Sequence, residues 1–483
     1  MKGNVQLAKG YERLREWMLS HPREVIQQRH DFKHRLTKSR CVYGEGSVFN
    51  ITLTPLFLRR ESLDLLASAS EAMDRILEKV MRLYVEGDPV IAEYFPRKPI
   101  PEAWIQASQR YSRITMHNRH DTLFDGTDLK FIELNTDNPG GKGWTDLYED
   151  LFLDHGPVRE YLPFERYQPD QRVLPALFDS VMDCHEALDS GAPPRVAFAS
   201  FRYLGRSRGE EEIMRDYFIS RGIEANLVDA RDFEFDSGRV SAGGVRYTVV
   251  HRSLRAGFYT RFPQEMREFV QAVLDPRQTA MVNSFQAAVG SEKTLLSLFS
   301  NPLRRHYFSD EEAEILARHI PWTRRLDETI TTSPEGEEIS LHEYLLADRE
   351  RLVIKPSDEA GGYGVVVGRN ATPEKWGETV EHGIGQPDWV VQDYVEIPRI
   401  QVPVIRGHKV ELETKWVNLS PYVFGGRYVG VLGRVSNEKV INVSAGGGII
   451  PVFPLSEIGQ EDPTPVLPSD EGRDSKRPRS GGA

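Results

Sequence analysis

The chain has 483 residues, of which 39% are hydrophobic and 28% are charged, and its formal net charge is -11 at pH 7. This length predicts two or three domains with an ample buried core, and the composition is that of an ordinary soluble globular protein. The acidic balance argues against general nucleic-acid binding, which needs a basic surface, but it leaves room for a local basic pocket.

The cysteine count and the hydropathy pattern indicate the cellular setting. Cys41 and Cys184 are the two cysteines, and neither has a CxxC partner, so we expect buried thiols in a reducing compartment rather than a disulfide framework. No apolar run approaches the roughly 18 residues that suggest a membrane-spanning helix. The first residues lack the apolar core of a signal peptide. We therefore expect no membrane contact and a cytoplasmic location.

The first part of the chain, residues 1–105, is predicted to be a helical region. Its firmest helix runs from Ser62 to about Glu86, where Gly87 ends it. The apolar residues of this segment recur at helical spacing and are expected to be core; they are Leu66, Met73, Ile76, Leu77, Val80 and Tyr84.

Two extended runs joined by an Asp-Gly turn signal at 125–126 follow, and they predict an antiparallel hairpin. In that pairing Asp121 lies opposite Glu133 and Arg119 lies opposite Asn135, with all four side chains on one face. Two facing carboxylates repel each other, and a divalent cation would remove that cost. Oxygen donors of this kind suit Mg²⁺ beside substrate phosphates. Read alone, the four residues also suit a hairpin whose charges face water.

Strand and helix patterns alternate from about residue 190. This alternation predicts a small α/β unit with parallel strands over 191–280, on the substrate side of the protein. The following strands and helices, 281–455, are expected to form nucleotide-binding lobes. The hairpin segment, 106–190, belongs to the same core, and the polar tail, 456–483, is expected to be disordered.

A lysine beside a glycine-rich loop is the main phosphate signal. Lys355 ends a strand, and Gly361, Gly362 and Gly364 follow it. Glycines let backbone N–H groups approach an anion, and the lysine adds a point charge. No GxxxxGK[ST] motif or strand-linked GxGxxG motif is present, which excludes a Walker loop and disfavours a dinucleotide site.

Three further segments add candidate contacts. Lys293 precedes an apolar helix and is a second candidate phosphate lysine. The strand that ends in Gln392, Asp393, Tyr394 and Val395 offers backbone groups to a flat base edge. Arg434 lies on a later strand and, taken alone, also suits an ordinary surface position.

Taken in order, these segments resemble the circularly permuted ATP-grasp family, which includes the amide synthetase domain of glutathionylspermidine synthase. The matching stretches are NRHD, FIELNTDNPGG, NSFQAAVGSEKTLL, VIKPSDEAGGYGVVVG, VVQDYVEIP and GRVSNEKVINVSAGGG. The acidic hairpin precedes the lysine-bearing strands, and this order is what identifies the permutation. No amidase domain with a catalytic cysteine is recognisable near the start, so glutathione and spermidine are not carried over as substrates.

The resemblance implies a mixed α/β (α+β) fold and assigns roles to individual residues. It places Mg²⁺ on Asp121, Glu133 and Asn135, and catalytic arginines at Arg119 and Arg434. It places ATP contacts at Lys293, Lys355, Gly361, Gly362, Gly364, Gln392, Asp393, Tyr394 and Val395.

The activity that this resemblance implies is that of an ATP-dependent carboxylate–amine ligase acting through an acyl phosphate. Its partners are expected to be small carboxylates and amines, from amino acids and peptides to polyamines. Two alternatives stay open, a non-catalytic ATP-binding regulator or scaffold, and a phosphotransferase.

Overall fold

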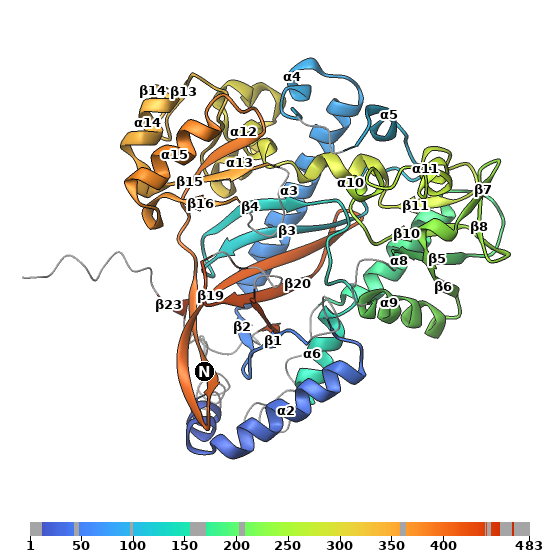
Figure 1. The fold of residues 1–483 in the computed structure, drawn as a ribbon, viewed down its shortest axis with the longest axis horizontal. Coiled ribbons are helices and arrows are strands. Elements are labelled where there is room, and N and C mark those ends of the chain that lie inside the picture. The colour runs from blue at the N-terminus through green and yellow to red at the C-terminus, as the bar shows by residue number, and fades with distance from the viewer. Residues whose placement is uncertain are drawn as a thin grey trace, which may run out of the picture.

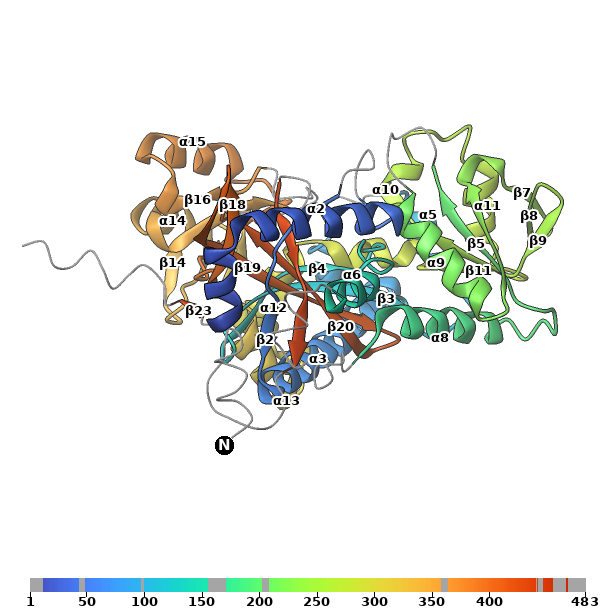
Figure 2. The same cartoon turned by 90° about the horizontal axis from the view of Figure 1, so that it is seen from below.

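The computed structural model describes residues 12–42, 48–96, 100–154, 171–201, 208–357, 364–439, 441, 446–454 and 466–467. Three main sheets organise these residues. Figures 1 and 2 show a mostly parallel unit at one end of the molecule and an antiparallel lobe at the other, with the largest sheet between them.

The largest sheet has eight strands, and the 16-residue strand β19 pairs with three of the others. The first half of β19 pairs with β18, and its second half pairs with β3, while β20 follows it on the other side. The hairpin partner β4 lies outside β3. The strands are β1 (Asn50–Ile51), β3 (His117–Phe124), β4 (Leu129–Asn135), β18 (Arg399–Arg406), β19 (Lys409–Phe424), β20 (Arg427–Ser436), β21 (Gly448–Ile450) and β23 (Val466–Leu467).

The second sheet is parallel, as the alternating pattern from about residue 190 predicts, and its strands lie between residues 195 and 282. Its strand order is β11-β10-β5-β6, and every neighbouring pair is parallel. The chain leaves β5 for β6 on one side and later returns to β10 on the other, so the carboxyl edge between β5 and β10 is a topological switch point. The strands are β5 (Arg195–Ser200), β6 (Glu224–Asp229), β10 (Val249–Arg252) and β11 (Ala280–Val282).

The third sheet is antiparallel and carries the predicted lysine strand. Its order is β12-β17-β15-β16, so β15 lies in the interior of the sheet. Its strands are β12 (Thr323–Arg325), β15 (Leu352–Pro356), β16 (Val366–Val367) and β17 (Trp389–Asp393). Smaller ladders join β2 (Leu56–Leu58) to β22 (Val452–Pro454), β7 (Glu234–Asp236) to β8 (Arg239–Ala242) and β9 (Val245–Tyr247), and β13 (Ile330–Thr332) to β14 (Glu338–Ser340).

The helices cover these sheets, and their bounds agree with the strongest sequence signals. The expected helix from Ser62 is α3, and a capping box formed by Ser309 and Glu312 opens α13. The helices are α2 (Pro22–Lys38), α3 (Arg60–Val85), α4 (Pro89–Ala92), α5 (Glu102–Ile105), α6 (Thr145–Leu153), α8 (Val173–Glu186), α9 (Gly209–Ser220), α10 (Ala256–Tyr259), α11 (Arg267–Leu274), α12 (Thr294–Ser300), α13 (Asp310–His319), α14 (Leu341–Ala347) and α15 (Pro373–Gly383).

Helix α3 supplies the central core. It packs against β19 and β20 (Figure 1), and its six predicted core residues are all buried. The N-terminal part also contributes strands, because β1 pairs with β21 and β2 pairs with β22. The β19–β20 hairpin turns at Gly425 and Gly426. Both cysteines are free and buried, as expected.

Truncation of one α3 core residue is expected to cost much of the stability. Leu77 is 1% exposed, so Leu77→Ala should leave a cavity and lower the free energy of unfolding by about 3 kcal/mol. Ile330 is 58% exposed, so Ile330→Ala serves as the control, with a change within about 0.5 kcal/mol. Urea unfolding of both variants measures the difference, and equal losses would contradict the assignment of the core.

Candidate active site

The β3–β4 hairpin has the predicted register. Arg119 pairs with Asn135 and Asp121 pairs with Glu133, and the register shifts only beyond Asp121. At the turn, the Asp125 carboxylate accepts hydrogen bonds from the next residues at 2.8–2.9 Å. The turn is also tied to α3, because the Ser62 hydroxyl donates to the carbonyl of the turn glycine at 2.7 Å. The hairpin is therefore fixed at its closed end.

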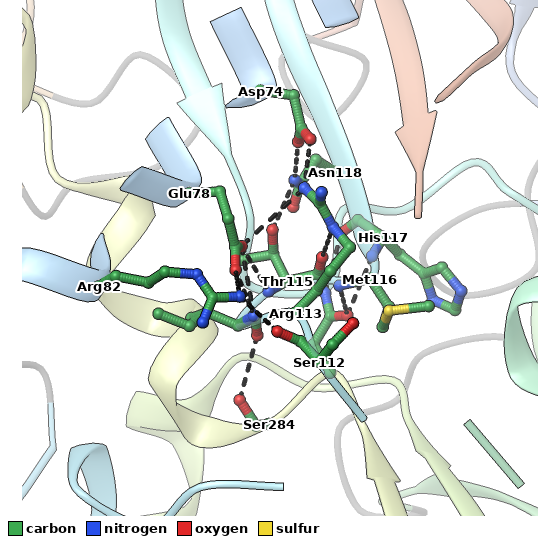
Figure 3. Close-up of polar contacts among 12 residues, drawn as sticks. Asp74, Glu78, Arg82, Ser112, Arg113, Thr115, Met116, His117, Asn118 and Ser284 are labelled. Carbon is green, nitrogen blue, oxygen red and sulfur yellow. Dashed lines mark hydrogen bonds and ion pairs between the residues drawn. The ribbon is translucent and has the colours of Figure 1, made fainter. Parts of the chain in front are cut away.

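Two carboxylates of α3 fix the other end of the hairpin (Figure 3). Glu78 accepts the Ile114 N–H at 2.9 Å, and Asp74 accepts hydrogen bonds from Asn118 and Arg113. Burial raises the pKa of Asp74 to about 6, in spite of the opposing effect of Arg113. These contacts hold the residues that lead into β3 against α3.

Asn283 joins both hairpin strands to the parallel unit. Its Oδ1 accepts the N–H groups of Met116 and His117 at 2.8 and 3.0 Å. Its Nδ2 donates to the carbonyls of His117 and Thr136, both at 2.9 Å. This buried amide therefore uses all of its main hydrogen-bonding capacity on the hairpin backbone.

One pocket collects the predicted site residues. It lies where the hairpin and β20 of the main sheet face β15 and β17 of the third sheet. The lining residues are Arg119, Asp121, Leu123, Ile132, Glu133, Asn135, Lys293, Val353, Lys355, Val365, Val367, Gln392, Asp393, Tyr394, Val395, Ile397, Asn418, Arg434, Lys439 and Ile441. Among them, five cationic side chains face three carboxylates, although the whole chain is acidic. The local excess of positive charge suits an anionic ligand.

Two predicted residues from distant parts of the chain form an ion pair in this pocket. Arg434 lies 2.6 Å from Asp121, between Nη2 and Oδ2. The Ser420 hydroxyl donates to the other carboxylate oxygen of Asp121 at 2.9 Å, and Arg119 lies 3.7 Å from it. Burial on its own raises the pKa of Asp121, but Arg434 and Arg119 hold it below its ordinary value. Asp121 is therefore an anion at neutral pH.

The two predicted lysines lie on the opposite wall. Lys293 Nζ is 2.9 Å from Glu133, and its backbone N–H donates to the Ser357 hydroxyl at 2.9 Å. Lys355 Nζ donates to Gln392 Oε1 at 2.6 Å. Burial and the neighbouring Lys293 lower the pKa of Lys355 to about 8. Two ammonium groups thus lie close together. Their repulsion raises the free energy of the pocket, and a bound anion would offset it.

The donor set suits a hard cation. The hairpin supplies two carboxylates and one amide on one face, and Mg²⁺ takes oxygen ligands of these kinds. The Asn135 Nδ2 is buried without a hydrogen-bond partner. The amide nitrogen would therefore lose no hydrogen bond if the side chain turned its oxygen toward a cation. Within the described residues no three His, Cys, Asp or Glu side chains meet at metal-binding distance.

The strand end at Gln392 to Val395 offers less backbone than the sequence suggests. The Asp393 N–H donates to the Trp322 carbonyl at 2.8 Å, and the Tyr394 N–H donates to the Arg351 carbonyl at 2.7 Å. Within the described residues, the Val395 N–H makes no backbone hydrogen bond. It is therefore the donor of this segment that a base edge can reach without breaking the sheet.

The glycine loop is described only in part. Gly361 and Gly362 lie outside the described residues. Gly364 has φ +73, where a side chain is strained, and an added Cβ would lie 2.9 Å from Pro356. Gly364 is not among the residues that line the pocket.

Sequence reasoning missed Asn418 and Ser420. Asn418 Oδ1 accepts from Arg434 at 2.6 and 2.9 Å, and Ser420 donates to Asp121. Polar residues at alternate positions inside an apolar strand would have been the signal, because they share one face.

Comparison with known proteins supports a shared fold. No known family model matches the chain. An uncharacterised protein from Synechocystis is 27% identical over 283 residues, which cover 54% of each chain. A putative glutamate–cysteine ligase from Frankia casuarinae is 34% identical over 113 residues, which cover 22% of this chain and 13% of that relative. The match therefore spans about half of the first relative and a small part of the second.

One solved structure is similar over nearly the whole chain. It is a glutathione synthetase-like effector from Globodera pallida, with a TM-score of 0.58, 12% identity, and coverage of 90% of this chain and 98% of that one. The likeness shows a common mixed α/β fold, in agreement with the expected ATP-grasp-like class. In the described part of the chain, no helix has the length and apolarity needed to cross a bilayer.

Replacement of Lys355 by methionine is expected to stabilise the free protein. Because the pKa of Lys355 is lowered to about 8, the folded protein carries a buried, charged ammonium below that pH, and this charge reduces the free energy of unfolding. Wild-type stability should then rise as pH increases from about 8 toward the ordinary lysine value, as the charge is lost. Lys355→Met should therefore have the higher melting temperature at pH 7, with a margin that shrinks as pH rises. Thermal unfolding from pH 7 to 10 measures this, and a margin independent of pH would contradict it.

Proposed function

We propose that the protein is an ATP-dependent carboxylate–amine ligase of circularly permuted ATP-grasp organisation. One observation carries the proposal. Every predicted site residue within the described part of the chain, apart from Gly364, lines the same pocket, although Arg119 and Arg434 are separated by most of the chain. A chance set of surface charges would not converge in this way.

The proposed division of roles follows the walls of the pocket. Lys293 and Lys355 would hold the phosphate groups of ATP, and the apolar side chains near Val395 would contact the base. Asp121, Glu133 and Asn135 would hold Mg²⁺, which when bound neutralises phosphate charge and orients the phosphates. The ion pairs of Asp121 with Arg434 and of Glu133 with Lys293 would then give way, so that both cations turn to the substrate.

The two arginines are the proposed catalytic groups. Arg119 and Arg434 would bind the substrate carboxylate and align it with the γ-phosphate, because the planar guanidinium can donate two parallel hydrogen bonds to a carboxylate or phosphate. A ligase of this class forms an acyl phosphate and ADP, and an amine then displaces phosphate to give the amide. The same arginines would stabilise the oxyanion of that second step.

The names of two similar proteins agree with this chemistry. One is called a putative glutamate–cysteine ligase, and the other, which shares the fold over most of this chain, is called a glutathione synthetase-like effector. This agreement supports the reaction class, while the substrates are proposed only as a carboxylate and an amine.

The acidic pair can be tested by isosteric substitution. Asp121→Asn and Glu133→Gln remove one charge each at nearly constant volume, so both proteins should fold. Mg²⁺-dependent ADP formation should fall by about a hundredfold or more, because charge neutralisation at the phosphates is lost. Lys130→Met, which alters the same hairpin outside the pocket, is the control. Full turnover by both acidic variants would remove these residues from the site.

The reaction class can be tested by product analysis. Incubation with ATP, Mg²⁺ and pooled amino acids, peptides and polyamines should yield ADP, phosphate and a product whose mass equals that of two substrates less one water. A phosphorylated product without condensation would establish a phosphotransferase instead. Nucleotide binding with no turnover on any pool would favour a regulator or scaffold.

A further inference from the structure

A cavity of about 170 Å³ lies at the edge of the main sheet, outside the candidate active site. It is found where β20 runs past the end of β21, whose ladder with β20 covers Gly433 to Val435. Its walls come from the first half of α3, the first half of α6, the start of α8, β20 and β22. No described residue lines both this cavity and the active-site pocket, so the two places are separate.

The charge of this cavity is entirely negative. Its lining includes four carboxylates, and none of the described residues along it is Lys, Arg or His. The carboxylates belong to Asp64 and Glu71 of α3 and to Asp146 and Glu149 of α6. An enclosed space with this charge favours a cation.

Two of the four carboxylates already have partners in the fold. Asp146 accepts the N–H groups of Val173 and Leu174, both at 2.9 Å, and so caps the first turn of α8. Glu71 accepts the Tyr428 N–H of β20 at 2.9 Å. These bonds tie α6 to α8 and α3 to β20, so they hold the walls of the cavity in place.

Glu149 faces the cavity without a partner. Its side chain is 6% exposed, and in the described part of the chain its carboxylate accepts no hydrogen bond and forms no ion pair. The guanidinium of Arg172 binds Asp150 instead, at 2.6 and 2.7 Å, and lies 3.5 Å from Asp146. Burial and the charge of Asp146 raise the pKa of Glu149 well above its ordinary value. Buried polar groups normally have partners, so this carboxylate needs an explanation.

Asp64 places a second unpaired carboxylate on the same cavity. It is exposed, and its side chain makes no hydrogen bond or ion pair within the described residues. The cavity therefore has one free carboxylate facing solvent and one inside. Its remaining walls include the apolar side chains of Leu63, Val431 and Val452. A ligand that suits these walls carries positive charge on a short apolar body.

The geometry favours an organic cation over a metal ion. Among the described residues, no three acidic or histidine side chains are close enough to share a metal. Separate carboxylates can instead accept N–H groups from different parts of one extended amine. The volume of about 170 Å³ is roughly ten times the 10–15 Å³ that a single water molecule needs, so an amine of several carbon atoms fits.

We propose that this cavity binds a small aliphatic amine in its ammonium form, with the charged nitrogen at Glu149 and, for a diamine, a second nitrogen at Asp64. The ammonium donates to the Glu149 carboxylate and displaces the proton that burial favours there, which passes to the solvent. The proposal goes beyond the ligase assignment and does not depend on it, because the cavity is separate from the active-site pocket.

The test titrates amines into the full-length protein by calorimetry, without nucleotide. n-Butylamine should bind, while n-butanol, which has the same chain without the charge, should not. 1,4-Diaminobutane should bind about threefold more tightly than n-butylamine, because Asp64 is exposed and adds only a weak ion pair. Glu149→Gln should weaken the binding of both amines about tenfold or more, and Asp64→Asn should remove only the advantage of the diamine. Glu311→Gln, which neutralises an exposed carboxylate of α13 outside the cavity, should change neither affinity.

Proton release distinguishes ammonium binding from a purely structural role of Glu149. An ammonium favours the ionised carboxylate and protons compete with it, so the affinity should rise as pH increases toward the raised pKa of Glu149. The heat of binding should differ between phosphate and MOPS buffers, whose enthalpies of ionisation differ, and Glu149→Gln should abolish this difference. The charged groups around Glu149 are Asp146 and Asp150 of α6, Arg172 before α8, and Asp64 and Glu71 of α3.

The outcomes decide the proposal without reference to catalysis. Failure of both amines to bind, or an unchanged affinity in folded Glu149→Gln, would overturn the site. Mg²⁺ or K⁺ that displaces both amines from it would overturn the organic cation as its ligand. If Glu149→Gln does not fold, Ala67→Leu, which fills the cavity from α3 without a change of charge, should weaken amine binding in its place. Because these titrations omit ATP, amine binding by a protein that never turns over ATP would sink only the ligase assignment.

Discussion

The arrangement of the pocket wall formed by the main sheet depends on the ion pair between Asp121 and Arg434. These residues belong to β3 and β20, which flank β19 on its two sides, so the pair crosses over β19. Asn418 and Ser420 of β19 bind one partner each. The net stabilisation from such a buried pair is small, because both charges lose their hydration. Its main effect is geometric, since it fixes where one carboxylate and one guanidinium sit before any ligand arrives.

The positive pocket is maintained inside an acidic protein by uneven placement of charge. The chain has a net charge of -11, yet cations outnumber carboxylates along the pocket wall. Lys293 lies close enough to Lys355 to disfavour its charge. The free protein therefore holds a repulsive arrangement, which a bound polyanion would relieve. This is the usual relation between a site prepared for its ligand and the stability of the unliganded protein.

Local patterns in the sequence predicted the hairpin, α3 and the parallel unit, because each has a strong short-range signal. The hairpin register followed from the turn alone. The pairing of β19 with β3 could not be predicted, since it joins residues about three hundred positions apart. Asn283 was missed for the same reason. A lone asparagine in a loop has no local pattern, and its importance comes from the segments that tertiary contacts bring to it.

The loop after β4 is held by side chains from several distant segments. Asn135 ends β4 at the pocket. In the loop that follows, Asp137 binds fully buried Arg252 of β10 at 2.6 Å and accepts the Ala256 N–H at 2.7 Å. The Thr136 carbonyl is held by Asn283, and Gly141 and Gly143 are held by Glu210. These contacts come from β10, α10, α9 and Asn283, so the loop that leaves the pocket is fixed by several segments at once, and the place of Asn135 in the pocket depends on them.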